Sequence, residues 1–188
     1  IIAHLDDILN YTQEISSYLA QRYDNYLIEY KTKTDNINNI LRFEPTQKEV
    51  IGWTINAVKI SQMEEKFATD FEARLLAMKK CSEKGYFVAV HFDPVVYFEN
   101  WEEEYSHVIR RIYEEIDKNK IIWISIGSLR FNASLKPIIE FRHPESKIVY
   151  GEMIKGADNK VRYFKDIRKN LYTKIVNNIK KYDLDAFI

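Results

Sequence analysis

The apolar residues of this chain alternate along its length between a helical spacing and short, dense runs. The run from Ile121 to Ile126 is nearly continuous, which is typical of a strand in a parallel sheet that is buried on both faces. Strands that alternate with helices predict βαβ units and a parallel sheet. We therefore expect one α/β domain over residues 1–188, built either as an open doubly wound sheet or as a section of a (β/α) barrel.

Turn and capping signals indicate where these elements begin and end. Thr69 and Glu72 have the spacing of a capping box, and Gly85 ends the helix that follows. Pro94 limits one strand, and Pro144 limits a later helix. The expected helices cover residues 1–22, 35–41, 69–84, 100–116, 135–141 and 166–182, and the expected strands cover 26–33, 50–56, 86–92, 121–126 and, at an edge, 147–153.

The composition is that of a folded domain, because 46% hydrophobic and 14% aromatic residues supply enough material for a core. No apolar run approaches the ~18 residues that span a bilayer, and no leader-like segment opens the chain. We therefore expect a soluble, cytoplasmic protein without a membrane partner. The single cysteine, Cys81, excludes an internal disulfide and a multi-cysteine metal site within the chain, and its place in the helical pattern predicts a buried structural thiol.

Charge is balanced over the whole chain but is unevenly distributed. The 28 basic and 28 acidic residues cancel, so bulk charge predicts no nucleic-acid partner. Residues 155–181 hold nine Lys or Arg and two acids, a net charge of +7, whereas residues 99–117 hold seven acids and two arginines, a net charge of −5. Within the basic segment, Arg162-Tyr163-Phe164 joins a cation to aromatic rings, which suits phosphate contact and base stacking. A solvated helix face is the alternative interpretation.

Polar residues follow the expected strands at the ends where parallel α/β folds bind ligands. These stretches are Lys31–Thr34, Thr54–Asn56, His91–Asp93 and Ser125–Arg130. One shared pocket and ordinary polar loops explain the pattern equally well. His91 and Asp93 share a strand face and could hold a metal, although we favour a hydrogen-bonded structural pair. No phosphate-binding glycine loop, HExxH motif or Ser/His/Asp spacing occurs.

Several short motifs then occur in an order that points to one family. They are Val50-Ile51-Gly52-Trp53-Thr54-Ile55-Asn56, Phe71-Glu72-Ala73-Arg74-Leu75, Gly85-Tyr86, Phe92-Asp93-Pro94, Trp101, Gly127-Ser128-Leu129-Arg130-Phe131, Arg142, Pro144 and Lys160-Val161-Arg162-Tyr163. With this order and spacing, the chain from about residue 26 to residue 188 resembles the middle and end of spore photoproduct lyase and its DNA-photolyase-like radical SAM relatives.

The resemblance implies a partial (β/α) barrel in which S-adenosylmethionine (SAM) lies across the strand ends, bound to a [4Fe-4S] cluster. It also implies reductive cleavage of SAM to a 5′-deoxyadenosyl radical, which abstracts hydrogen from a thymine-dimer lesion in DNA. By the same likeness, Lys33 or Lys31 would pair with the carboxylate of SAM, and Thr54 would lie near the same ligand. The remaining candidates are Asn56 and Arg74 for the cofactor, and Arg162, Tyr163 and Arg168 for DNA.

The sequence departs from the family pattern at the cysteines. The CxxxCxxC triplet that holds the cluster and the hydrogen-donor cysteine are both absent, and Cys81 alone cannot replace them. We therefore expect the C-terminal part of a longer protein, inactive and without cofactor by itself, with the cluster cysteines upstream of Ile1. Exposed barrel edges predict self-association through Ile1–Leu19 or near Ile188. The alternatives are a non-catalytic nucleic-acid-binding module and a purely structural α/β domain.

Overall fold

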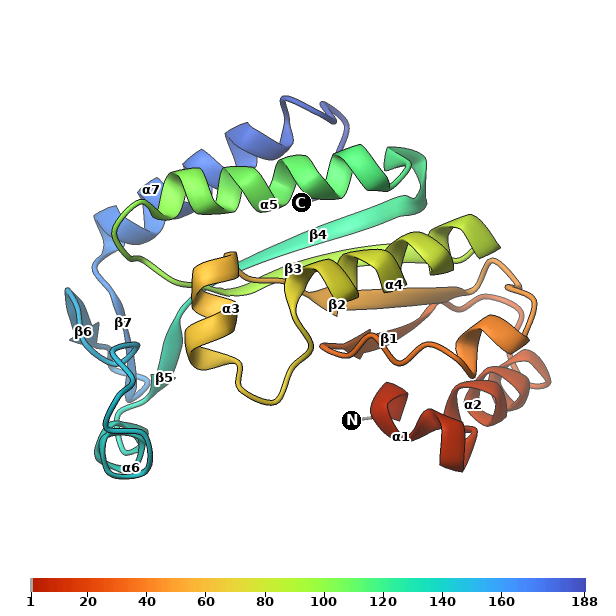
Figure 1. The fold of residues 1–188 in the computed structure, drawn as a ribbon, viewed down its shortest axis with the longest axis horizontal. Coiled ribbons are helices and arrows are strands. Elements are labelled where there is room, and N and C mark those ends of the chain that lie inside the picture. The colour runs from red at the N-terminus through yellow and green to blue at the C-terminus, as the bar shows by residue number, and fades with distance from the viewer. Residues whose placement is uncertain (1) are drawn as a thin grey trace.

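A computed structural model describes residues 2–188, and its centre is a four-stranded parallel sheet. Strands β1 (Ile28–Thr32), β2 (Glu49–Thr54), β3 (Phe87–Val95) and β4 (Ile121–Ser128) lie side by side in chain order (Figure 1). Sequential order with helical connections is the arrangement of a (β/α) barrel segment. The expected partial barrel is therefore confirmed. Strand β3 runs on through Pro94, beyond the end that the sequence predicts.

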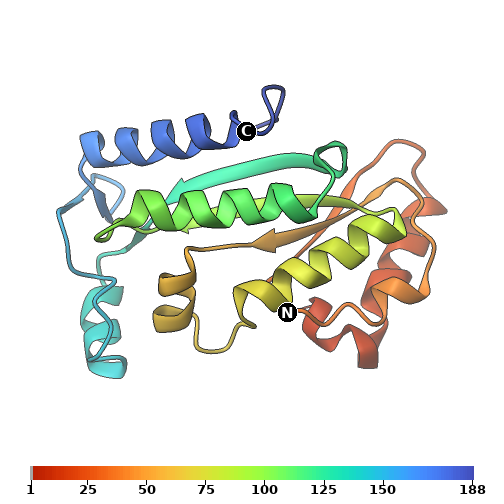
Figure 2. The ribbon, with the colours of Figure 1, turned by 45° about the horizontal axis from the view of Figure 1, so that its top comes forward.

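The apolar core lies on one face of this sheet. Helices α4 (Phe71–Lys84) and α5 (Trp101–Glu115) run along that face, and α7 (Lys165–Ile179) lies beside α5 (Figure 2). Helices α1 (Ile2–Leu9) and α2 (Tyr11–Ala20) lie at the β1 end. Because the described helices contribute to a core on one face, the doubly wound alternative is wrong. The side chains of this core include Trp53, Met78, Val90, Phe92, Tyr105, Ile109, Ile124, Leu171 and Ile175.

The local signals of α4 explain why it begins and ends where it does. Asp70, rather than Thr69, is the N-cap, and its carboxylate accepts a hydrogen bond from the Ala73 amide at 2.8 Å. Gly85 ends the helix with a φ of 114°, a left-handed conformation that favours glycine. Cys81 is fully buried inside this helix, which confirms the prediction of a buried thiol.

The N-terminal region differs from the single helix expected over residues 1–22. Asn10, with a φ of 52°, separates α1 from α2. The buried carboxylate of Asp6 accepts hydrogen bonds from both the amide and the hydroxyl of Thr12, so it caps the start of α2. The side-chain amide of Asn39 donates to the side chains of Asp6 and Asn10, so a loop distant in sequence stabilises the break between α1 and α2. That loop holds only a short 3₁₀ turn, η1 (Ile40–Arg42), where a helix over 35–41 was expected.

A small antiparallel sheet follows β4 and was not expected from the sequence. It consists of β5 (Arg130–Asn132), β7 (Lys160–Tyr163) and β6 (Met153–Lys155), in that order. Helix α6 (Leu135–Arg142) precedes β6, and the predicted edge strand over 147–153 is wrong, since a turn occupies most of it. Helix α3 (Val58–Glu64) and the short η2 (Lys118–Lys120) were also missed. The strands of the small sheet, β5, β6 and β7, have three or four residues each, too few to show a periodic pattern of apolar residues.

Two contacts place the basic segment and the end of the chain in the fold. Lys174 on α7 pairs with Glu102 on α5 at 3.1 Å, so part of the basic segment lies against the acidic one. The Ile124 amide donates to the Phe187 carbonyl at 2.8 Å, so the last described residues run along the outer edge of β4. No helix within residues 2–188 has the length and apolar character required to cross a bilayer.

Candidate functional site

The carboxyl ends of the four parallel strands meet at one edge of the sheet, and Lys33 lies there directly after β1 (Figure 1). The Lys33 ammonium pairs with the carboxylate of Glu65, in the loop between α3 and α4. Together they line an open hollow of about 580 Å³, which Thr32, Thr34 and Phe67 also border. Lys31 is exposed on β1, on the other face from Tyr30.

A buried guanidinium connects Glu65 to the neighbouring strand. Arg74 on α4 donates to Glu65 Oε2 at 2.9 Å and to the Thr54 carbonyl at 2.8 Å. It also donates to the hydroxyl of Ser61 on α3. Arg74 is therefore committed to protein groups, and it links Lys33, through Glu65, to the end of β2. The family resemblance suggested Arg74 as a cofactor contact. In the structure, its guanidinium donates hydrogen bonds to α3, the α3–α4 loop and β2.

The charges around Glu65 determine its protonation. Burial acts to raise the pKa of the Glu65 carboxyl, but the hydrogen bonds and positive charges of Lys33 and Arg74 outweigh burial and hold this pKa below its usual range. Glu65 is consequently a fixed negative charge at neutral pH. Sequence reasoning missed this residue, because a loop glutamate carries no periodic signal; only its place just before the Thr69 capping box could have drawn attention to it.

Thr54 and Asn56, at the end of β2, are placed differently from each other. The Thr54 side chain is only 5% exposed, and its hydroxyl makes no recorded hydrogen bond to the part of the chain that the structure describes. The Asn56 amide donates to the Pro94 carbonyl at 3.2 Å, while its oxygen accepts from the Ala57 amide and the Tyr105 hydroxyl. Thr54 is thus available to a ligand, whereas Asn56 ties β2 to β3 and α5.

His91 lies on the face of the sheet away from the helices. Its Nδ1 is 2.6 Å from the Ser125 hydroxyl on β4, and its Nε2 contacts Glu29 on β1. The Glu29 side chain crosses β2 at Gly52, where an added Cβ would lie 2.1 Å from Glu29 Oε1 and 3.0 Å from His91 Nε2. Both ring nitrogens of His91 have partners, but these are Ser125 and Glu29, so the hydrogen-bonded pair of His91 with Asp93 that we favoured does not form. Among the side chains that the structure describes, those of residues 5–188, no group of three or more His, Cys, Asp or Glu could hold a metal.

The three residues predicted to contact DNA lie together where β7 meets α7. The Arg162 guanidinium pairs with Asp158, whose pKa this hydrogen bond holds below its ordinary value, and Arg168 Nε donates to the Tyr163 carbonyl at 3.1 Å. Tyr163 is buried, and its hydroxyl accepts from the Tyr97 amide at 3.0 Å. The ring of Tyr163 is therefore not free to stack on a base in this structure, and Phe164 is the exposed aromatic residue here.

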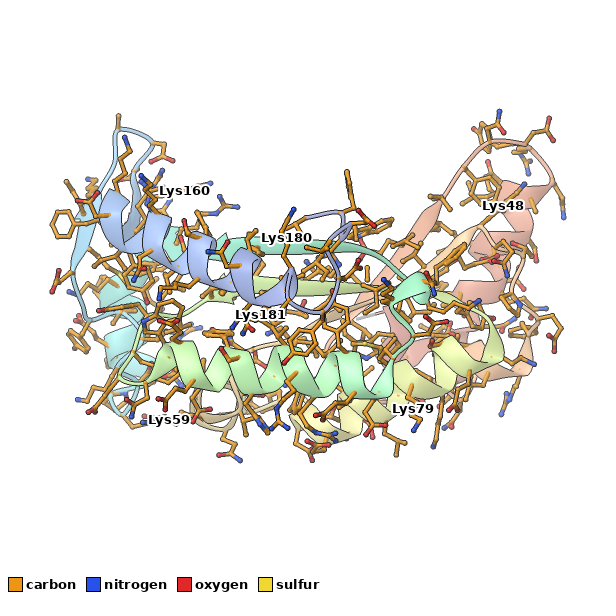
Figure 3. The ribbon with its side chains drawn as sticks, turned by 90° about the horizontal axis from the view of Figure 1, so that it is seen from above. Lys48, Lys59, Lys79, Lys160, Lys180 and Lys181 are labelled. Atoms are coloured by element: carbon orange, nitrogen blue, oxygen red, sulfur yellow. The ribbon has the colours of Figure 1, made fainter. Side chains whose placement is uncertain are left out.

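The net positive charge of residues 155–181 is spread from the small sheet to the far end of α7. Seen from above, Lys160 lies near the small sheet, whereas Lys180 and Lys181 lie at the far end of α7 (Figure 3). With Lys174 paired to Glu102, the segment does not form one compact cationic patch.

Comparison with known proteins identifies the family. The family model described as spore photoproduct lyase matches residues 2–186, nearly the whole chain. The chain belongs to the spore photoproduct lyase family. The resemblance inferred from the order of its motifs is therefore confirmed. Spore photoproduct lyase of Clostridium acetobutylicum is 24% identical over 159 residues, which are 81% of this chain and 47% of the relative. The Bacillus subtilis enzyme is 24% identical over 66% of this chain and 37% of its own length.

Solved structures of spore photoproduct lyase share the same fold. One with bound AdoMet and dinucleoside spore photoproduct superposes with a TM-score of 0.89, at 19% identity, over 99% of this chain and 57% of that one. Another, complexed with dinucleoside spore photoproduct, gives a TM-score of 0.87 with the same coverage. The chain thus spans about half the length of these relatives.

The residues present fit part of what this family uses. A lysine with an exposed ammonium at a strand end suits the carboxylate of SAM, and the Thr54 hydroxyl at the end of the neighbouring strand could also bind a ligand oxygen. The iron–sulfur cluster does not fit, because the one thiol of the chain, Cys81, is enclosed in the core and burial raises its pKa to about 12. The described residues therefore offer side chains that suit the carboxylate of SAM, but they do not offer the thiolates that would hold an iron–sulfur cluster.

Proposed function

We propose that this chain forms the C-terminal part of the barrel of a radical SAM lyase that repairs a thymine-dimer lesion in DNA. The observation that carries the proposal is the family match over residues 2–186, together with Lys33 and Thr54 at the strand ends of the shared fold. Structures of relatives hold AdoMet and dinucleoside spore photoproduct, the cofactor and the lesion that we propose here.

In this proposal Lys33 and Thr54 receive the carboxylate of SAM. The Lys33 ammonium has three donors, of which Glu65 takes one, so others remain for a ligand. The Thr54 hydroxyl at the end of β2 is the second group that we propose, and Arg74 connects the two positions through the Thr54 carbonyl and through Glu65, the partner of Lys33. SAM, when bound to a cluster, supplies the radical chemistry; the residues of this chain bind and orient it. The cluster ligands belong to another segment or chain, so we expect residues 1–188 alone to be inactive.

Cofactor binding gives the first test. Equilibrium dialysis with labelled SAM, compared with decarboxylated SAM, measures whether the carboxylate is recognised. Because a hydrogen bond to a charged group contributes about 1.5–3 kcal/mol, Lys33→Met should weaken SAM binding by about 10- to 100-fold and leave decarboxylated SAM unaffected. Lys31→Met is measured alongside, because the resemblance allows either lysine: a loss in Lys31→Met with none in Lys33→Met would assign the contact to Lys31. Equal binding of both ligands to wild type would remove the proposed subsite.

DNA contact is proposed at the end of β7 and the start of α7. Arg162 and Arg168 lie there with the exposed ring of Phe164, as phosphate contact with stacking requires. A salt titration of DNA binding should show a shallower slope in Arg162→Glu and Arg168→Glu than in wild type. Lys180→Glu, at the far end of α7, is the control of equal charge change (Figure 3). If all three variants lose affinity equally, the contact is diffuse and the proposed interface is wrong.

A further inference from the structure

The carboxylate of Glu65 lies between two cations and holds both. One oxygen accepts from Lys33, and the other accepts from Arg74 at 2.9 Å and from the Ser61 hydroxyl at 3.2 Å. Ser61 in turn accepts from Arg74, so the carboxylate is anchored on its inner side by two partners that also contact each other. Because Arg74 and Ser61 anchor its inner side, Glu65 keeps its position when Lys33 binds a ligand.

Burial decides which of these charges a ligand meets. The side chain of Arg74 is 1% exposed and that of Glu65 is 9% exposed, whereas that of Lys33 is 40% exposed. Arg74 therefore does not border the hollow at the end of β1, whereas Lys33 borders it with an exposed ammonium and Glu65 with a small exposed fraction. The charges of Arg74 and Glu65 still act there through the poorly screened interior.

The three side chains carry two positive charges and one negative charge, a net charge of +1. Two other charged groups border the hollow: Lys66, which pairs with Glu145, and Glu64, which accepts from the neutral Ser146 hydroxyl at 2.7 Å and so keeps its own negative charge. Without Glu65, Lys33 and Arg74 would carry two positive charges with no negative charge between them. Such a site would favour a phosphate dianion over a single carboxylate.

We propose that Glu65 is the specificity residue of this anion site: its fixed carboxylate keeps the site at one net positive charge, so that it accepts a single carboxylate and rejects phosphate. This inference rests on the proposed function of Lys33 as the partner of a ligand carboxylate. Glu65 contacts Lys33 and not the ligand, so it acts as a positioning residue. Phosphate groups, of DNA or of nucleotides, are thereby kept from the end of β1.

The test uses inorganic phosphate at pH 8, where the dianion predominates, titrated by calorimetry against the full chain. Glu65→Gln should bind phosphate at least about tenfold more tightly than wild type, because one close negative charge is removed. The double variant Lys33→Met/Glu65→Gln should lose this gain. Glu64→Gln is the matched control, since Glu64 borders the same hollow without contacting Lys33, and its effect should stay below about threefold. Unchanged phosphate affinity in folded Glu65→Gln overturns the proposal.

Glu65→Gln leaves Arg74 without a charged partner, so its fold is checked first by circular dichroism. If it does not fold, Glu65→Asp replaces it, because the shorter carboxylate keeps the charge beside Arg74 while withdrawing from Lys33. Wild-type phosphate affinity in Glu65→Asp supports the role of charge, and a tenfold gain there overturns it. The SAM comparison in wild type is independent: its failure removes the carboxylate ligand, whereas the phosphate series alone decides the role of Glu65.

Discussion

The two faces of the parallel sheet use the same strands in different ways. On the helix-covered face, side chains such as Phe92 and Ile124 are almost completely buried among apolar neighbours. On the other face, Glu29, His91 and Ser125 form a chain of polar contacts across β1, β3 and β4. Period-two alternation places both kinds of residue on every strand. One face therefore stabilises the domain, and the other presents the polar interior of the barrel.

Glycine makes the polar face possible. Besides the crossing at Gly52, a Cβ at Gly127 on β4 would lie 2.5 Å from a carboxylate oxygen of Asp93. Carboxylates thus lie directly over backbone on this face, where the helix-covered face has interlocking apolar side chains. We therefore expect the covered face to be destabilised most by substitutions that remove side-chain volume, and the polar face by substitutions that add it.

The largest effect is expected from removing volume on the covered face. Phe92→Ala deletes a fully buried ring that lies edge-on to Tyr105, with ring centroids 6.2 Å apart. Truncations of this kind cost about 3–5 kcal/mol of unfolding free energy. Urea denaturation measures the loss, and Phe92→Leu is the control that should retain most of the stability. A loss below about 1 kcal/mol for Phe92→Ala would mean that the two faces do not differ as described.

A smaller effect is expected from adding volume on the polar face. Gly52→Ala brings a methyl group into the space of the Glu29 carboxylate, so about 1–3 kcal/mol of unfolding free energy should be lost. In a double-mutant cycle, Glu29→Ala should relieve part of that loss, because the group it removes is the one that the methyl meets. Strictly additive losses in this cycle would show that Glu29 does not cross the strand at Gly52.

The helix-covered face is also the part that the sequence predicts well. The periods of α4, α5 and α7 and the dense strands β3 and β4 were visible, because burial on one side selects apolar residues at regular spacing. The break at Asn10 could not be predicted, since it depends on a contact with Asn39 far along the chain. Among the site residues, Lys33 and Thr54 were found through the motif order, whereas Glu65 was missed because only the folded chain brings it to Lys33.

The third effect tests the hydrogen-bonded chain itself. Ser125→Ala removes the partner of His91 Nδ1 and leaves the contact of Nε2 with Glu29 in place. A neutral hydrogen bond of this kind contributes about 0.5–1.5 kcal/mol to stability. Ser125→Thr restores a hydroxyl on the same strand and serves as the control, with urea denaturation as the measurement. A loss as large as that of Phe92→Ala would contradict the division between the faces.

The smallest effect concerns Lys33 and Glu65 at the strand ends, and it depends on pH. Because the pKa of Glu65 lies below its ordinary value of 4.5 in the folded chain, its stabilising contribution is complete above that value and is lost as the pH falls through the folded pKa. Lys33 is one of the groups that lower this pKa, but its side chain is 40% exposed, so solvent screens the pair. Lys33→Met should therefore destabilise the chain by less than about 1 kcal/mol at pH 7. The difference from wild type should shrink as the pH is lowered below 4.5. Thermal unfolding at several pH values, with Lys31→Met alongside, measures this convergence. A difference that does not shrink in acid would mean that Lys33 has no part in lowering the pKa of Glu65.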